Sequence, residues 1–520
     1  MKSITLARPT TARDEPAGAI WRDAAAGIAG VSVAVGLSEL AAGLVPGVPS
    51  LVASVGSAVI DLQPPGAKEL VVALFGANDK LALELFIVGV ALAAGALVGA
   101  LAGRWPWLAA AGFGAFGLLA FGATLLDPQA SPALSAVSVG ASVWIGVRVL
   151  TWLARRGRLR ATGSMPSWSR RSFLIRSGGV VVAAGVGGVL GRSLIEARLT
   201  SPAVAGTTVP PAARLASLPP AAELNVQGIT PLVVPNEDFY RIDTALLLPS
   251  VDLATWRLRI HGMVERETSL TFEQLAQLPL FEQYVTIACV SNEVGDDLVG
   301  NAKWTGVSLR DVLDMAGVQP GATQLVGRSV DGWTAGMPTA WVMDPAREPM
   351  IALRMNDEPL PIAHGFPARL IVPGLYGYVS ATKWLSELEL TTLEAFDAFW
   401  IPRGWAKEAP ILTQSRIDVP RPATGIAAGR GAIAGVAWAP DRGISRVEVS
   451  VDGEWREARL SNPISDATWV QWRVDWDATP GRHTLAVRAT DGEGTVQTDQ
   501  RTPPAPDGAR GHHTISVQVG

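Results

Sequence analysis

The chain is poor in cysteine, histidine and charged residues. Cys289 is the only cysteine among 520 residues, which excludes a disulfide within the chain and a zinc site built on several thiolates. The five histidines are too few for most dinuclear or multi-histidine metal sites. Charged residues make up 17% of the chain, against about 25% in a typical soluble domain. The net charge of −4 and the absence of a basic stripe argue against nucleic-acid binding.

The apolar residues are concentrated before residue 200. Segments 85–103 and 105–126 contain no charged residue and are long enough to cross a hydrocarbon core of ~30 Å. Segments 24–44 and 132–154 are weaker spans, each with a charged residue near one end. We therefore predict a four-span membrane bundle within residues 1–160. The motif LQPPG interrupts segment 51–77, which predicts two short helices that lie at the outer interface or re-enter it.

Basic residues orient these spans. Four lysines and arginines precede the first span, Arg104 lies between the second and third, and RRGRLR follows the fourth. The loop DPQASP between the third and fourth spans has no basic residue. Because cytoplasmic loops carry the excess of Lys and Arg, we expect both ends of the four-span bundle to face the cytoplasm.

Residues 161–200 contain SRRSFL at 169–174, which resembles the twin-arginine export signal. Fifteen apolar residues, Ser177–Gly191, follow it, a length that suits a signal h-region. A fifth transmembrane helix with ordinary cytoplasmic arginines is the alternative. The signal predicts that the chain after about residue 195 lies outside the cytoplasm and carries a complex cofactor. The AVA motif at 203–205 fits a cleavage site, so whether the rest stays tethered is open.

The remainder of the chain has the pattern of a soluble protein. After a Pro-rich linker at 201–225, we predict an α+β domain at 226–410 with mixed sheets, with strands at 255–264, 284–290 and 368–392 and helices at 269–279 and 308–318. Short alternating runs at 411–520 predict a β-sandwich of the immunoglobulin type, commonly a binding or dimerising module. The predicted fold is multi-domain: a helical membrane bundle, an α+β domain and an immunoglobulin-like sandwich.

Cys289 lies at the end of the predicted strand 284–290, just before the polar sequence SNEVGDD. A lone cysteine is most often a buried small hydrophobe. It can also be a nucleophile, a redox sensor or a single thiolate ligand to a metal. Composition alone leaves these alternatives open.

Six motifs in order resemble the sulfite oxidase family of molybdopterin enzymes, in its bacterial membrane-anchored branch. They are PNEDFYRID, the cysteine after a strand, WTGVSLRDVL, DG at 331–332, HGFPARLIVPGLYG and TKWL. The resemblance runs from about residue 230 to residue 405 and continues into the sandwich. It implies a molybdenum-molybdopterin cofactor in which the Cys289 thiolate, a soft ligand, binds the redox metal.

The resemblance also implies a set of site residues. The expected catalytic group is Cys289, Asn292 and Trp333. The expected cofactor-binding residues are Asn236, Tyr240, Arg241, Ser329, Asp331, His364, Arg369, Gly377, Tyr378 and Lys383. His364 and Arg369 match positions that hold the pterin phosphate, for which a guanidinium is well suited. Read alone, the DG pair is an ordinary turn, Lys383 a surface lysine, and the motif around Asn236 a polar turn.

The chain departs from the family pattern after the cysteine. Sulfite-oxidising members have AGNRR there, whereas this chain has VSNEVGDD. We expect Glu293, Asp296 and Asp297 to repel an oxyanion such as sulfite or nitrate. Trp333 stands in the region where sulfite oxidisers have an active-site tyrosine. The prediction is an oxidoreductase that acts on a compound other than sulfite, such as a neutral S-oxide or N-oxide.

No haem motif occurs in the sequence, since it has neither Cys-x-x-Cys-His nor a histidine pair in the spans. We therefore expect no haem in this chain and electron exchange with a quinone or a redox protein. The sandwich makes a homodimer one of the expected assemblies. A membrane-tethered scaffold that keeps the fold without catalysis stays open as the second function. A transporter is disfavoured, because Glu39, Glu84 and Arg148 lie near span ends.

Overall fold

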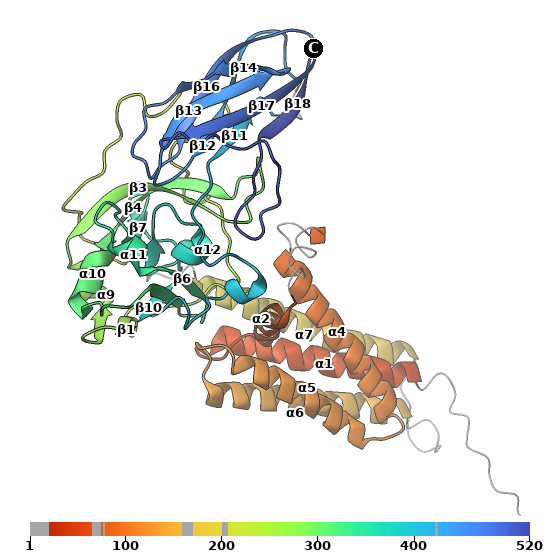
Figure 1. The fold of residues 1–520 in the computed structure, drawn as a ribbon. Coiled ribbons are helices and arrows are strands. Elements are labelled where there is room, and N and C mark those ends of the chain that lie inside the picture. Colours follow the sequence, from red (N-terminus) through yellow and green to blue (C-terminus); the bar gives the residue numbers. More distant parts are fainter. Residues whose placement is uncertain (1–19, 65–73, 76–78, 159–169, 200–205, 422–424) are drawn as a thin grey trace, which may run out of the picture. The chain divides into compact units, whose positions relative to one another are not determined.

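The structure is a computed structural model, and it divides into two compact units, Met1–Leu199 and Thr200–Gly520 (Figure 1). The residues it describes are 20–520, apart from 65–73, 76–78, 159–169, 200–205 and 422–424. Ser169 of the signal motif, the AVA motif and most of the second predicted interfacial helix lie outside the described residues.

The first unit is a bundle of α-helices. They are α1 (Ile20–Leu44), α2 (Leu51–Leu62), α4 (Asp79–Ala102), α5 (Trp107–Thr124), α6 (Pro132–Arg158) and α7 (Arg170–Leu199). Within the described part of the chain, all except the short α2 are long and apolar enough to cross a membrane, which gives five candidate spans. Helix α1 packs against α4, α6 and α7. The four predicted spans are present, and the unit fits a multi-pass membrane protein.

Helix α7 is longer than the predicted signal segment. It continues for 30 residues, because the polar residues that follow the apolar stretch have partners on neighbouring helices. Arg192 pairs with Glu84 of α4 at 3.1 Å, and Arg198 donates to the carbonyl of Ala42 in α1 at 3.2 Å. By length and composition, α7 qualifies as a fifth span.

Close contact between α1 and α7 depends on glycine. A Cβ added at Gly43 would lie 2.5 Å from the carbonyl oxygen of Gly191. Between α1 and α6, a Cβ added at Gly30 would lie 2.8 Å from the carbonyl oxygen of Gly146. Small residues allow helix backbones to approach in this way inside membranes. The glycines of the apolar segments thus determine which helices can pack side by side.

The second unit begins with two five-stranded sheets. The first has the order β2 (Thr268–Thr271), β1 (Arg257–Gly262), β10 (Leu385–Thr391), β5 (Gln324–Ser329) and β6 (Thr334–Pro338), with β1 and β10 parallel. The second has β3 (Leu280–Ala288), β4 (Val299–Ser308), β7 (Met350–Met355) and β8 (Glu358–Pro359), with β9 (Arg369–Ile371) paired to β7. Short helices α9 (Phe272–Ala276), α10 (Leu309–Ala316), α11 (Thr339–Met343) and α12 (Gly377–Ser380) connect them.

The predicted elements are present with shifted bounds. The predicted helix at 269–279 is β2 followed by α9, because Thr271 caps α9 in a capping box with Gln274 and leaves the preceding residues free to pair with β1. The predicted strand at 284–290 is β3, which ends at Ala288, one residue before the cysteine. The mixed sheets and short helices agree with the predicted α+β domain.

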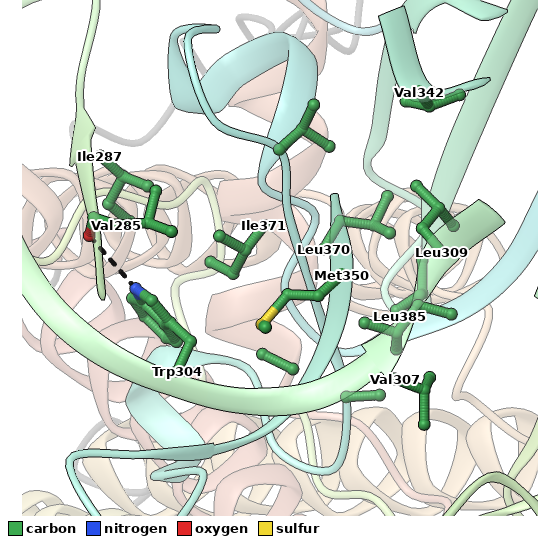
Figure 2. Packing of buried hydrophobic residues seen from close by; sticks show 14 of the residues in the cluster. Val285, Ile287, Trp304, Val307, Leu309, Val342, Met350, Leu370, Ile371 and Leu385 are labelled. Atoms are coloured by element: carbon green, nitrogen blue, oxygen red, sulfur yellow. Dashed lines mark hydrogen bonds between the residues drawn. The ribbon is translucent and has the colours of Figure 1, made fainter. Parts of the chain in front are cut away.

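The sheets share one apolar core (Figure 2). Trp304 of β4 is fully buried, and its indole nitrogen donates to the carbonyl of Val285 in β3 at 3.3 Å. Met350 of β7 and Ile371 of β9 are also fully buried in this cluster. Such continuous burial explains why β3 is apolar along most of its length.

The C-terminal residues form two four-stranded sheets packed on a common core. One contains β11 (Gln414–Val419), β12 (Gly429–Trp438), β16 (Val470–Ala478) and β15 (Arg459–Leu460). The other contains β14 (Glu454–Glu457), β13 (Ile444–Val451), β17 (Gly481–Asp491) and β18 (His513–Val519). This arrangement is a β-sandwich.

The sandwich also shares the core of the α+β domain. Trp438 and Trp469 are buried in the central cluster rather than in the sandwich cluster. The backbone nitrogen of Trp469 donates to the Thr286 hydroxyl at 2.8 Å. The described part of the Pro-rich linker is attached as well, since Ala213 donates to the carbonyl of Leu280 at 2.8 Å. The 206–221 segment therefore lies along the globular unit.

Candidate cofactor site

Cys289 begins a closed loop between β3 and β4. Its backbone nitrogen donates to the carbonyl of Leu298 at 2.9 Å, and its carbonyl accepts from the Asn292 nitrogen at 3.1 Å. The Asn292 side chain accepts in turn from the Leu298 nitrogen at 2.8 Å. Cys289 is a free cysteine with 9% of its surface exposed. Asn292, predicted as catalytic, thus holds the loop that carries the cysteine.

Two buried cations come from the HGFPAR and TKWL motifs. Arg369 opens β9 and Lys383 follows α12, and both are buried. Burial lowers the pKa of Arg369 to about 10 and that of Lys383 to about 8. Lys383 Nζ lies 3.1 Å from a carboxylate oxygen of Asp243, which also pairs with Arg241 at 2.9 Å. Lys383 is therefore a buried lysine paired with Asp243, and the alternative of a surface lysine is wrong.

His364 is buried beside these cations. Its Nε2 lies 2.9 Å from the backbone oxygen of Asn236, so Nε2 carries the hydrogen of that bond. The pKa of His364 is lowered to about 4, mainly by burial and in part by the charge of Arg369. The imidazole is therefore neutral at physiological pH, with the lone pair on Nδ1.

Two buried nitrogen atoms mark where an anion fits. Among the described residues, His364 Nδ1 and Arg369 Nε have no hydrogen-bond partner, although buried polar atoms are nearly always bonded. The Arg369 guanidinium lies over the Trp304 ring, 5.3 Å from its centroid, and its Nη1 donates to the His364 carbonyl at 3.2 Å. Phosphate oxygens would accept from the Arg369 fork and favour protonation of His364. These residues fit the phosphate of a pterin cofactor.

Tyr240 and Gly377 meet next to the cysteine strand. A Cβ added at Gly377 would lie 3.7 Å from the carbonyl oxygen of Ala288 and 4.0 Å from the Tyr240 hydroxyl. Burial raises the pKa of Tyr240, and the charge on Cys289 raises it further. The Tyr240 hydroxyl therefore stays protonated and can donate hydrogen bonds in this region.

Tyr376 is a second protonated phenol that the sequence did not single out. It is 3% exposed, and its hydroxyl accepts from the Leu412 nitrogen at 3.4 Å. Burial raises its pKa, and Cys289 contributes to the shift. Asp243 and Trp304 were likewise missed, although the RID and WTGVS motifs contain them. An aspartate three residues after Tyr240 was the available signal for a partner to a buried lysine.

The other predicted residues have supporting roles in the structure. Asn236 donates through Nδ2 to Glu358 at 3.0 Å and accepts from Asn356 at 3.0 Å, so it braces its own loop and presents its carbonyl to His364. Arg241 is exposed. The Tyr378 hydroxyl donates to the Ala406 carbonyl at 2.5 Å, which ties α12 to the segment before β11.

Ser329, Asp331 and Trp333 belong to the hairpin between β5 and β6. The Trp333 nitrogen donates to the Asp331 carboxylate at 3.1 Å and the Ser329 nitrogen to the Trp333 carbonyl at 2.9 Å. Burial raises the pKa of Asp331, and the nearby charge of Asp243 adds to it. The DG pair is therefore a turn that is electrostatically linked to the cation site.

The acidic residues after the cysteine lie at the surface of the loop. Glu293, Asp296 and Asp297 are exposed. Partial burial raises the pKa of Asp296, as do the charges of Glu293 and Asp297. This mutual repulsion shows that the three carboxylates share one region of space.

Comparisons with known proteins identify a molybdopterin-binding domain in this part of the chain. The family model for the oxidoreductase molybdopterin binding domain matches residues 245–400. Human mitochondrial sulfite oxidase is 29% identical over 320 residues, which cover 52% of this chain and 58% of that protein. The chain thus spans somewhat over half the length of that relative.

Two other proteins are similar. The uncharacterised oxidoreductase YuiH of Bacillus subtilis is 33% identical over 154 residues, covering 30% of this chain and 74% of YuiH. The crystal structure of the sulfane dehydrogenase SoxCD from Paracoccus pantotrophus is 24% identical, covers 58% of this chain and 88% of its own, and has a TM-score of 0.49. The chain belongs to the sulfite oxidase family of molybdopterin-dependent oxidoreductases.

Proposed function

We propose that this chain is a membrane-anchored oxidoreductase in which Cys289 ligates the molybdenum of the molybdenum-molybdopterin cofactor of its family. The observation that carries the proposal is the buried group of Arg369, Lys383 and His364, in which two nitrogen atoms have no partner among the described residues. The buried phenol of Tyr240 links this group to the cysteine, because the charges of both Arg369 and Cys289 act on its pKa. Arg369, Lys383 and His364 would hold the pterin phosphate. Asp243 balances part of the positive charge and fixes the lysine.

When bound, the cofactor supplies a metal centre that exchanges two electrons and transfers an oxygen atom. The chain contributes buried donors whose protons are retained at neutral pH, the hydroxyls of Tyr240 and Tyr376. Reduction of an S-oxide or N-oxide consumes two electrons and two protons and releases the reduced compound and water. Phenols that stay protonated suit this direction, because they can donate hydrogen bonds to the oxide oxygen.

The proposed substrate is neutral. The exposed carboxylates of Glu293, Asp296 and Asp297 stand on the loop that begins with Cys289, and their field opposes the approach of sulfite or nitrate. A neutral S-oxide or N-oxide meets no such barrier.

The proposed location of the catalytic unit is extracytoplasmic. A basic N-terminal segment and basic loops after the second and fourth of five spans support an orientation with Arg170 inside and the chain after α7 outside. The twin-arginine motif supports export of a folded, cofactor-loaded unit. The proposed electron partner is a quinone or a redox protein. We also propose that the β-sandwich is of the immunoglobulin type and that it can support a homodimer.

Metal analysis of the full chain purified in detergent tests the proposal. We expect about one molybdenum per chain, loss of that metal in Cys289→Ser, and retention in Lys407→Met, which removes a lysine paired with Asp397 at the surface of the same unit. A screen of S-oxides and N-oxides with a reduced dye as electron donor should then find a substrate. Metal-free wild-type protein together with a fully folded Cys289→Ser variant would favour the scaffold function instead.

A further inference from the structure

The loop that begins with Cys289 is held from outside the α+β domain. Arg416, on strand β11 of the sandwich, donates through Nη1 to the carbonyl of Asp296 at 2.8 Å. Asp296 lies two residues before Leu298, whose carbonyl accepts from the Cys289 nitrogen. A hydrogen-bonded path of one side chain and a short backbone segment therefore joins the sandwich to the cysteine.

The Arg416 guanidinium is fixed on its other sides. Its Nε donates to Asp418 at 2.7 Å and its Nη2 to the Thr230 hydroxyl at 2.8 Å. The second carboxylate oxygen of Asp418 accepts from the Thr230 nitrogen at 3.0 Å. Arg416 is 7% exposed, so the fork is preorganised, and solvent screens these charge-assisted bonds only weakly.

A second contact between the sandwich and the loop lies at Gly295. Its φ is +96°, and an added Cβ would lie 2.5 Å from the His513 ring. His513 is held by the Ile417 nitrogen, which donates to Nδ1 at 3.0 Å. The backbone of the acidic loop thus packs directly on a histidine of β18 that β11 fixes.

We propose that Arg416 is a positioning residue of the cofactor site, through which the sandwich sets the position of the Cys289 loop. The sandwich then helps to position the proposed metal ligand, in addition to any role in binding or dimerisation. The proposal rests on the proposed function only in the assignment of Cys289 as metal ligand. The clamp itself is a property of the chain.

Amide hydrogen exchange in the full chain, purified in detergent, tests the clamp. In Arg416→Gln we expect amides of the peptide 289–298 to exchange about tenfold faster or more, since a bond to a charged group is lost. The rest of the sandwich should keep its protection. Arg473→Gln is the matched control, because Arg473 pairs with Asp475 on β16 with the same spacing as Arg416 with Asp418, but its side chain is 40% exposed. It should leave peptide 289–298 unchanged.

The single cysteine supplies a second readout. Maleimide labelling of this chain reports Cys289 alone, and its rate, compared between metal-free samples in which the thiol is free to react, should rise in Arg416→Gln. The spectrum of the reduced metal centre should change in the same variant. Thr230→Val removes one bond of the fork and should produce a smaller change, which keeps the test valid if Arg416→Gln does not fold.

The outcomes separate the two proposals. Equal exchange and labelling in wild type, Arg416→Gln and Thr230→Val would overturn the clamp even if molybdenum is present. Faster exchange throughout the sandwich would also overturn it, because Arg416 would then serve only stability. Metal-free wild-type protein with faster loop exchange in Arg416→Gln would leave the clamp standing and refute the proposed function.

Discussion

Lowering the pH from 7 to 5 should destabilise the globular unit through His513. The pKa of this histidine is lowered to about 4, mainly by burial and in part by the charges of Arg416 and Arg501, which Asp418 opposes. Geometry agrees, because Nδ1 accepts a hydrogen bond from the Ile417 nitrogen at 3.0 Å and cannot take a proton without breaking it. The folded pKa lies below the unfolded value of 6.5. The neutral histidine therefore contributes stability above pH 6.5 that is lost as the pH falls toward 4.

The magnitude follows from these two pKa values. Between pH 7 and pH 5 the linkage amounts to about 2 kcal/mol of unfolding free energy. The ring is half-buried, so screening by solvent reduces this to about 1 kcal/mol. For a unit of this size we expect a fall in the thermal midpoint of about 2 °C.

The assay compares wild type with His513→Asn. The asparagine oxygen can still accept from the Ile417 nitrogen, but it does not titrate. Thermal midpoints of the full chain in detergent, followed by tryptophan fluorescence at pH 7 and pH 5, give the difference between the two pH responses. Titration of His364 and of the carboxylates cancels in this difference. An identical pH response in both proteins would refute the reasoning.

Three further changes test other parts of the structure. Gly43→Val places atoms against the Gly191 carbonyl and should lower the melting midpoint of the membrane unit. The control is Gly185→Val, which should leave the midpoint unchanged because a Cβ at Gly185 meets no atom within 4 Å. Lys383→Met removes a buried positive charge from the proposed phosphate site, while Arg241 still pairs with the Asp243 carboxylate. It should reduce the molybdenum and pterin content roughly tenfold, measured by metal and pterin analysis; unchanged content would remove the lysine from the site. Trp304→Phe removes the indole bond to β3 and part of a fully buried ring and should cost about 1–3 kcal/mol, measured as a lower thermal midpoint with the fold retained by circular dichroism.

Local patterns predicted most of the elements but not how they end. Uncharged length predicted the spans, alternation predicted the strand at 255–264, and an apolar run predicted the strand at 284–290. The end of α7 was not predictable from its own sequence, because Arg192 and Arg198 extend the helix through partners on α4 and α1. The sequence around Thr271 likewise contained both a strand and a helix, and pairing with β1 decided between them.

The candidate site shows the same division. The phosphate motif predicted His364 and Arg369 as cofactor-binding residues, and the structure buries both side chains. The motif did not predict Asp243, which lies 140 positions from the lysine it contacts. Tyr376 and Arg416 carry no local signal, because their roles depend on contacts with segments distant in sequence.

The amino-acid sequence alone determined the membrane and soluble halves, the candidate cofactor and its single thiolate, because hydropathy, spacing and residue chemistry are local properties. Only the tertiary structure decided which charges are buried, which buried nitrogen atoms lack partners, and that a strand of the sandwich holds the cysteine loop. Burial and pairing depend on segments far apart in the chain, and the pKa values and hydrogen bonds of the site follow from them.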